Sequence, residues 1–334
     1  MRLALAGLAR SGKSTLFSAL TSHGRAEKNL ALLPVTDDRV DRLAAIYKPK
    51  KATYAQISYV DPPPPVVKPE DPTARLPVEL RQADGLVEVV RNFDGGFGTP
   101  QPRADHLAFS DELKLSDQIT IENRLDRIDQ DRKRGRKGDP EEIRFLEESK
   151  ELLGQEMALV SRPELAEHPK LRGFGFLSAK PVVLISNNED DDSSAPDLGE
   201  DEPPVVIRAR IEAELAELSP EEREEFAEDL GLKESALIRI IAASFSSMDM
   251  ITFFTANQNE VRSWSIKRGS TAIEAAGTVH SDMEKGFIRA EVIRCDDLIS
   301  LGSEAAVKKA GRMNLVGREH VIDEGDVLYI RFNV

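Results

Sequence analysis

Residues 7–14, GLARSGKS, decide the fold of this chain. They follow a short apolar segment, Leu3 to Leu5, and precede a segment with helical periodicity, Ser14 to Leu20. A loop of the pattern G-x-x-x-x-G-K-[ST] between a strand and a helix turns its backbone N–H groups inward, and the helix N-terminus adds a partial positive charge. The sequence therefore predicts a phosphate-binding loop here, rather than a glycine-rich turn that only precedes a helix.

The residue types of this loop suit a nucleoside triphosphate with magnesium. We expect Lys13 to neutralise the β- and γ-phosphates and the Ser14 hydroxyl to ligate Mg²⁺. The predicted nucleotide contacts in the loop and the first helical turn are Gly7, Arg10, Ser11, Gly12, Lys13, Ser14 and Thr15.

Other short apolar segments predict more strands of the same sheet. Helical segments separate them, which favours an α/β fold with a mainly parallel sheet covered on both faces. The candidate strands are Leu3 to Leu5, Ala55 to Val60, Gly85 to Val90, Val182 to Ile185 and Val205 to Ile207.

Between Ser110 and Val160 the pattern changes to charge-rich helix, which predicts an inserted helical hairpin. Asp139 is a good N-cap for the second helix because Pro140 follows it at the first helical position. The expected tip is basic, and it is either a solvated turn or a contact for ribosomal RNA. Its basic residues are Arg132, Lys133, Arg134, Arg136 and Lys137.

Composition limits the cellular setting and the partners. The net charge of −14 argues against a broad, non-specific grip on nucleic acid. The single cysteine, Cys295, excludes an internal disulfide framework and fits a reducing compartment. No segment has the roughly 18 uncharged apolar residues that a membrane span needs. We therefore expect a soluble, cytoplasmic protein with no membrane contact.

Several segments resemble one family, the YchF type of Obg-like GTPases. The similarity lies in GLARSGKSTLFSAL and DRVDRLAAIYKPKK, and most strongly in the block from FFTANQNEVRSWSIKRGSTAIEAAGTVHSDMEKGFIRAEVI through VIDEGDVLYIRFNV. The resemblance implies a P-loop domain of the GTPase type with a helical hairpin insert and a carboxy-terminal β-grasp (TGS) domain. It also implies a partner among RNA or ribosomes. The expected boundaries are 1–104 and 166–248 for the nucleotide-binding domain, 105–165 for the hairpin and 249–334 for the TGS domain.

The family's base-recognition motif resembles LISNNEDD, with Asn187 at the family's asparagine and Asp190 at its final acid. A register one residue later, Asn188 to Asp191, also reads N-x-x-D, and a polar turn after a buried strand is a further alternative. By position, Ala209 falls in the last base-contact motif. The resemblance implies ATP or GTP as the ligand and leaves the choice between them open.

The switch regions depart from the family pattern. The D-x-x-G motif appears as Asp61-Pro62-Pro63-Pro64, and a proline at the glycine position has no N–H to give the γ-phosphate. Asp61 remains suited to the magnesium shell. The following PPVVKPEDPTARLP favours a stiff, polyproline-like segment. We therefore predict Mg-dependent nucleotide binding with slow hydrolysis and no identified catalytic residue. The alternative is a pseudo-GTPase that serves as an interaction scaffold.

Overall fold

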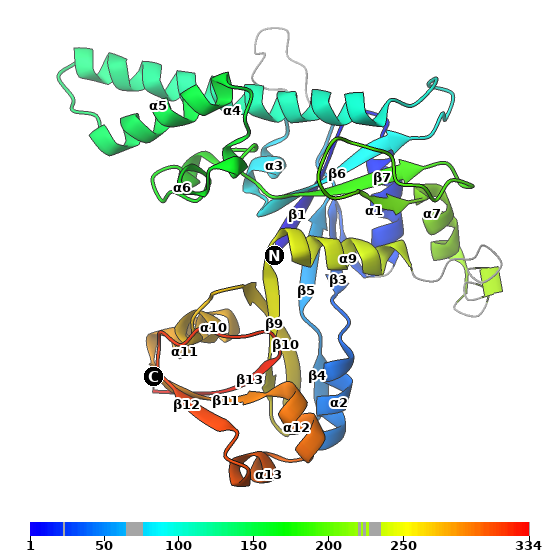
Figure 1. Ribbon diagram of the computed structural model, residues 1–334, viewed down its shortest axis with the longest axis vertical. Coiled ribbons are helices and arrows are strands. Elements are labelled where there is room, and N and C mark those ends of the chain that lie inside the picture. Colours follow the sequence, from blue (N-terminus) through cyan, green and yellow to red (C-terminus); the bar gives the residue numbers. More distant parts are fainter. Residues whose placement is uncertain (23, 65–75, 220–221, 223–224, 227–234, 334) are drawn as a thin grey trace. The chain divides into compact units, whose positions relative to one another are not determined.

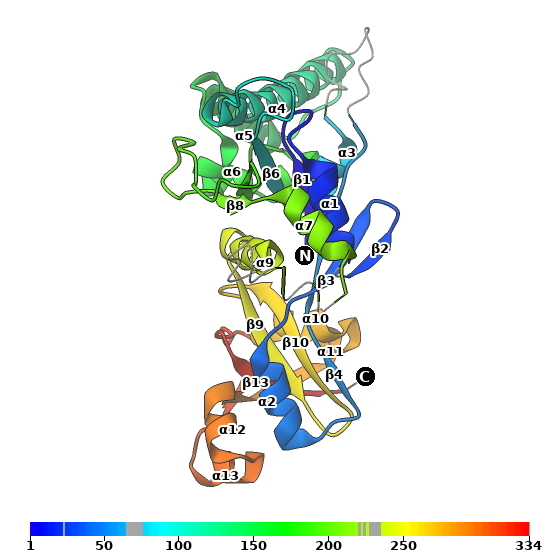
Figure 2. The same ribbon diagram turned by 90° about the vertical axis from the view of Figure 1, so that its right-hand side faces the viewer.

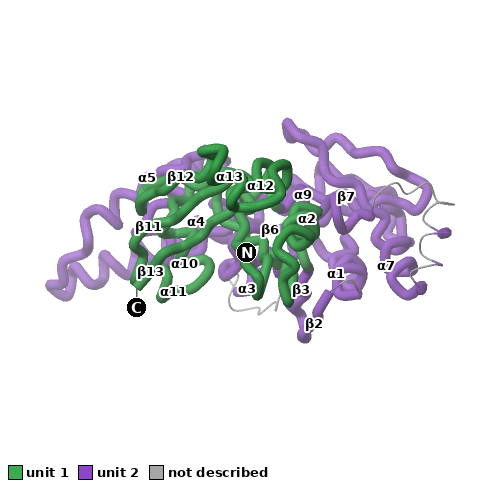
Figure 3. Tube along the Cα trace, turned by 90° about the horizontal axis from the view of Figure 1, so that it is seen from below, with its two compact units in different colours: residues 1, 34–57, 245–334 green, residues 2–33, 58–244 purple. Residues whose placement is uncertain are grey.

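The structure is a computed structural model that describes residues 1–22, 24–64, 76–219, 222, 225–226 and 235–333. The chain forms two compact units, which Figure 3 distinguishes by colour. Unit 2 contains Arg2–Leu33 and Ser58–Ser244, whereas unit 1 contains Met1, Pro34–Ile57 and Phe245–Val334. Most of the predicted polyproline-like segment lies within residues 65–75, outside the described residues.

Unit 2 is built on the predicted, mainly parallel sheet. Its seven strands have the order β2-β3-β5-β1-β6-β7-β8. Strand β1 pairs in parallel with β5 and β6, and β7 pairs in parallel with β6 and β8, while β2 and β3 form an antiparallel edge. The strands are β1 (Arg2–Ala6), β2 (Arg25–Glu27), β3 (Leu30–Pro34), β5 (Gln56–Val60), β6 (Gly85–Asn92), β7 (Val182–Asn188) and β8 (Val205–Ile207).

Helices cover both faces of this sheet. On one face, Ala4 and Ala6 of β1 pack against Leu80 of α3 and Phe109 of α4. On the other face, α1 and α7 lie side by side (Figures 1 and 2). The helices are α1 (Lys13–Ser22), α3 (Val78–Gln82), α4 (Pro102–Lys133) and α7 (Ala209–Glu217), with shorter turns at α6 (Pro163–Ala166), η2 (Leu159–Ser161) and η3 (Arg172–Phe174). Helix α9 (Ala236–Ser247) follows towards the carboxy terminus.

Helices α4 and α5 (Pro140–Gly154) form a hairpin (Figure 1). The Asp139 side chain accepts from the N–H groups of Glu141 and Glu142, which caps α5 as the sequence predicts. Apolar side chains of both helices, among them Ile121 and Leu146, form one core. Helix α4 is joined to the segment before β7 through Asp117. Its fully buried carboxylate accepts three hydrogen bonds from that segment.

Unit 1 contains a six-stranded mixed sheet with the order β12-β11-β13-β9-β10-β4. Strand β9 pairs with β13 in parallel and with β10 in antiparallel fashion, and α10 packs on one face. The strands are β4 (Lys51–Thr53), β9 (Met250–Ala256), β10 (Glu260–Lys267), β11 (Phe287–Arg294), β12 (Met313–Val316) and β13 (Asp326–Phe332). The helices are α2 (Asp38–Tyr47), α10 (Ala272–Val279), α11 (Ser281–Lys285), α12 (Cys295–Leu301) and α13 (Glu304–Lys309).

An early segment of the chain completes this carboxy-terminal unit. Strand β4 pairs in parallel with β10, and Val40 and Leu43 of α2 are buried in the same core as Phe254. The sequence places residues 34–57 in the first part of the nucleotide-binding domain, whereas the structure places them in unit 1. The physical reason is the apolar face of α2, whose burial partners are residues more than two hundred positions later.

Among the described residues, no helix is both long enough and apolar enough to span a membrane.

Candidate nucleotide-binding site

The glycine-rich loop between β1 and α1 has a backbone that only certain residues adopt. Gly7 and Gly12 have φ angles of 118° and 96°, and Arg10 between them has a φ of 66°. A Cβ atom on Gly7 would lie 2.5 Å from the carbonyl oxygen of Val89 on β6. Because such a contact is closer than van der Waals packing permits, the loop can pass this strand only with glycine at position 7.

The Lys13 ammonium lies over this loop. Its Nζ donates to the carbonyl oxygens of Gly7 and Leu8, at 3.0 and 2.7 Å, and lies 3.5 Å from the Ser11 hydroxyl oxygen. Burial lowers the pKa of Lys13, and the negative charge of Asp61 acts in the opposite direction. The chain thus holds a lysine over the glycine-rich loop, which is where a loop of this sequence pattern places the cation that contacts phosphate.

Ser14 and Asp61 meet beside Lys13. Burial raises the pKa of the Asp61 carboxyl, and a hydrogen bond with Ser14 and the charge of Lys13 oppose that effect. The N–H of Asp61 donates to the carbonyl oxygen of Asn29 at 2.9 Å, which fixes the end of β5 against the β2–β3 turn. A hydroxyl and a carboxylate are hard oxygen ligands that suit Mg²⁺.

In the described part of the chain, no group of three or more His, Cys, Asp or Glu side chains is arranged to hold a metal. A magnesium ion at Ser14 and Asp61 would complete its shell with phosphate oxygens and water. That pattern is the usual one for Mg²⁺ at nucleotide sites.

Asn187 at the end of β7 connects the loop to α7. Its Nδ2 donates to the Ser11 carbonyl at 3.1 Å, and its Oδ1 accepts from the Ala209 N–H at 3.0 Å. A Cβ on Gly12 would lie 2.2 Å from Asn187 Nδ2. The structure therefore brings Asn187 to the loop, together with Ser11, Gly12 and Ala209.

Asn188, the start of the alternative register, is held elsewhere. Its side chain donates to Asp192 at 3.1 Å and to the Ser194 carbonyl at 2.7 Å. These contacts tie down the acidic loop after β7 and do not reach the glycine-rich loop. The register that starts at Asn187 stays a prediction, and it is the one whose asparagine contacts the glycine-rich loop.

Asp190, three residues after Asn187, is held by two arginines that flank Ala209. Arg208 Nη1 donates to the Asp190 carbonyl oxygen at 3.1 Å, and the Arg210 guanidinium forms an ion pair with the Asp190 carboxylate. The sequence motif identifies positions 208–210 but does not reveal this pairing, because it depends on how α7 approaches the end of β7.

The remaining predicted contacts, Arg10 and Thr15, are exposed at the edge of the candidate site. Thr15 is exposed on the first turn of α1, and Arg10 is exposed with its guanidinium 4.8 Å from the centre of the Phe97 ring. Phe97 was not predicted as a neighbour of the loop. The glycine-rich segment around it is the only signal that could have suggested a turn at this place.

A charged cluster beneath the loop, in which Glu88 and His106 are buried and Glu200 is exposed, also escapes sequence reasoning. His106 of α4 contacts Glu88 of β6 through Nδ1 at 3.0 Å and Glu200 through Nε2 at 3.2 Å. The hydrogen bond with Glu88 raises the pKa of His106 to about 9 against the opposing effect of burial. The available signal was a single acid inside the apolar segment GLVEVV.

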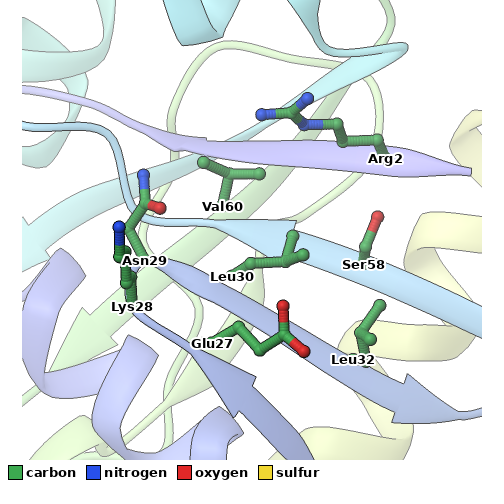
Figure 4. A pocket seen from close by; sticks show the side chains of 8 residues that line it. All are labelled: Arg2, Glu27, Lys28, Asn29, Leu30, Leu32, Ser58 and Val60. Atoms are coloured by element: carbon green, nitrogen blue, oxygen red, sulfur yellow. The ribbon is translucent and has the colours of Figure 1, made fainter.

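A separate hollow lies on the sheet near β2, with a volume of about 680 Å³ (Figure 4). Side chains of β1, β2, β3 and β5 line it, including Arg2, Leu30 and Val60, and Asn29 lies at one end. At the Asn29 end of this hollow, the N–H of Asp61 donates to the Asn29 carbonyl oxygen.

Comparisons with known proteins agree with this fold. The family model YchF-GTPase_C, described as a protein of unknown function (DUF933), matches residues 250–333. The chain is 34% identical over 360 residues to the ribosome-binding ATPase YchF of Bacillus subtilis (strain 168), covering 99% of this chain and 98% of the relative. It is 35% identical over 358 residues to the protein of the same name from Escherichia coli O157:H7, with the same coverage of 99% and 98%.

Two solved structures resemble the chain over its whole length. The YchF GTPase of Schizosaccharomyces pombe aligns with a TM-score of 0.79 and 26% identity, covering 99% of this chain and 97% of that one. A GTP-binding protein from Pyrococcus horikoshii OT3 aligns with a TM-score of 0.62 at 19% identity over all of both chains, which supports the fold alone.

The sheet order, the glycine-rich loop and these structural matches place the chain among P-loop proteins of the GTPase fold. Within that class, the full-length identity to its relatives shows that the chain belongs to the YchF family. It is a divergent member, because proline stands at position 64 where the family's D-x-x-G motif has glycine.

Proposed function

We propose that this protein binds a purine nucleoside triphosphate, ATP or GTP, with Mg²⁺ at the loop between β1 and α1. The observation that carries the proposal is the position of Lys13 over the loop, with the Ser14 and Asp61 oxygens beside it. When bound, Mg²⁺ would neutralise phosphate charge. Lys13 would exchange its loop carbonyl partners for phosphate oxygens, and the loop amides would donate to the same phosphates.

We propose further that hydrolysis is slow. Phosphoryl transfer depends on a positioned water and on stabilisation of charge on the γ-phosphate. Pro64 has no N–H for that phosphate, and Asp61 alone cannot replace it. The same feature supports a second function from another class, a scaffold whose bound nucleotide has a structural role.

Ribosome association is the third part of the proposal. The relatives from Bacillus subtilis and Escherichia coli are named ribosome-binding ATPases. In this chain, the basic turn between α4 and α5 and the carboxy-terminal unit are the candidate contacts. Within the turn, Lys133 pairs with Asp129 and Arg136 with Asp131, so part of its charge is already compensated. Arg134 and Lys137 are exposed in the same turn.

A titration with ATP and GTP, each with Mg²⁺, tests nucleotide binding. We expect saturable binding by the parent protein and a loss of about 100-fold or more in affinity for Lys13→Ala, because charge-assisted hydrogen bonds to phosphate are lost. Lys150→Ala is the matched control, since Lys150 is an exposed lysine paired with Glu122 on the hairpin. Binding that survives in Lys13→Ala would overturn the assignment of the loop.

Single-turnover hydrolysis then separates the two function classes. A slow but measurable release of phosphate, absent in Lys13→Ala, supports an NTPase. Tight binding with no release supports the scaffold. For the ribosome contact, we expect Arg134→Glu with Lys137→Glu to weaken sedimentation with ribosomes and to reduce its dependence on salt, whereas Arg162→Glu leaves both unchanged.

A further inference from the structure

Asp190 stands at the final acid of the base-recognition motif, the position expected next to the base. Its carboxylate forms an ion pair with Arg210. Arg210 stands at the second residue of α7, and its Nη2 approaches an Asp190 carboxylate oxygen. Its Nε also lies 3.7 Å from Glu214, one helical turn later. A second acid therefore helps to hold the guanidinium in place beside Asp190.

This ion pair belongs to the same hydrogen-bonded frame as the phosphate loop. Ser11 is joined to Asn187, and Asn187 is joined to Ala209, the residue directly before Arg210. Arg208 holds the backbone of Asp190 from the other side. The backbone on which the carboxylate and the guanidinium stand is thus tied to the residues predicted to bind the nucleotide.

The two purines make different demands on such a pair. Guanine presents two donors, its N1–H and its N2 amino group, and a free carboxylate accepts both. Adenine presents one donor, its N6 amino group, next to one acceptor, its N1. A carboxylate paired with a guanidinium offers one acceptor beside one donor. That pattern matches adenine and leaves one guanine N–H facing a guanidinium N–H.

On these grounds we infer that Arg210 is a specificity-determining residue, which shifts the base preference of this site away from guanine by engaging Asp190. The inference rests on the proposed nucleotide binding at this loop. The side chains of Arg210 and Asp190 are 74% and 31% exposed, so the pair is accessible to a base. Exposed ion pairs are weak, and the expected change in selectivity is therefore several-fold rather than absolute.

The experiment compares the ratio of dissociation constants for GTP and ATP in four proteins: the parent, Arg210→Ala, Asp190→Ala and the double variant. We expect the parent to favour ATP and Arg210→Ala to shift the ratio toward GTP by about threefold or more. In the Asp190→Ala background, removal of Arg210 should no longer shift the ratio, because the carboxylate that it masks is gone. Arg162→Ala, an exposed arginine paired with Glu164, is the matched control.

Inorganic tripolyphosphate as a competitor of the nucleotide separates a selectivity effect from damage to the site. Tripolyphosphate has no base and contacts only the residues that bind phosphate. Its affinity should therefore be the same in the parent and in Arg210→Ala. An unchanged GTP-to-ATP ratio in Arg210→Ala, with both nucleotides bound, overturns the inference and leaves the proposed function intact. A parent protein that binds neither nucleotide nor tripolyphosphate overturns the proposed function itself.

Discussion

The phosphate end and the base end of the candidate site are assembled in different ways. The phosphate end comes from one strand-loop-helix segment, residues 7–15, whose glycines have positive φ angles. The base end brings Asn187 and Asp190 after β7 together with Arg210 of α7. A local motif thus supplies the residues proposed to bind phosphate, whereas the residues proposed to recognise the base are held together by long-range contacts.

Gly12 is the point where the two ends meet, and its substitution should have the largest effect. In Gly12→Ala the new Cβ meets Asn187 Nδ2 at 2.2 Å, on a backbone with φ of 96°. We expect a loss of about 3 kcal/mol in the free energy of unfolding, from backbone strain and from displacement of the asparagine. Urea denaturation followed by circular dichroism measures it, and binding of ATP and GTP should fall together.

The matched control for that variant is Gly96→Ala. Gly96 has a φ of 80°, but an added Cβ there would meet nothing within 4 Å. Its substitution should cost only about 1 kcal/mol, the strain of the left-handed conformation. Equal losses in the two variants would contradict the idea that Gly12 is restricted by Asn187.

Asn187→Ala tests whether the base end depends on the link to the loop. The substitution removes the hydrogen-bond partner of the Ser11 carbonyl and of the Ala209 N–H. We therefore expect a loss of about 2 kcal/mol in the free energy of unfolding. Nucleotide affinity should fall with it. Asn188→Ala should destabilise the acidic loop through its lost contact with Ser194 but leave nucleotide affinity unchanged. If Asn188→Ala is the variant that loses nucleotide, the later register is correct.

The cluster of Glu88, His106 and Glu200 beneath the phosphate end should make stability depend on pH. The folded-state pKa of His106, about 9, is above the ordinary value of about 6.5. Its stabilising contribution is therefore fully present below about pH 6.5 and is lost as the pH rises through about 9. Between these two pH values we expect the free energy of unfolding of the parent protein to fall by roughly 1–2 kcal/mol relative to that of a Glu88→Gln, His106→Gln double variant.

Urea titrations of both proteins at a series of pH values measure that difference. A stability difference that stays constant from pH 6 to pH 9.5 would show that His106 does not carry a proton in the folded protein.

The sequence predicts the fold where contacts are local or periodic. The glycine-rich loop, the parallel strands and the capped hairpin are all confirmed, since each depends on spacing within a short segment. The β2–β3 edge was missed because Arg25–Glu27 is short and polar. The membership of residues 34–57 in unit 1 was also missed, because the partner of β4 is β10, far along the chain.

The candidate site shows the same division between local and long-range information. Lys13 and Ser14 follow from the motif, and Asp61 follows from the family resemblance. The ion pair of Arg210 with Asp190 and the contact of His106 with Glu88 could not be predicted. Both join side chains whose sequence neighbours carry no sign of a partner, and only the packing of α7 and α4 brings them together.

The smallest expected effect concerns recognition of the γ-phosphate at the phosphate end of the site, and Pro64→Gly tests it. The variant restores an N–H at the position where the family's glycine donates to the γ-phosphate, but it also adds flexibility to the unfolded chain and the loop. The net gain is about one hydrogen bond to a charged acceptor, reduced by that entropy, and we expect about a threefold rise in the preference for a non-hydrolysable ATP analogue over ADP. Pro63→Gly has the same added flexibility without an N–H at position 64, so it should leave the preference unchanged. If both variants show the same preference for the ATP analogue over ADP, the missing N–H at Pro64 does not limit recognition of the γ-phosphate in this protein.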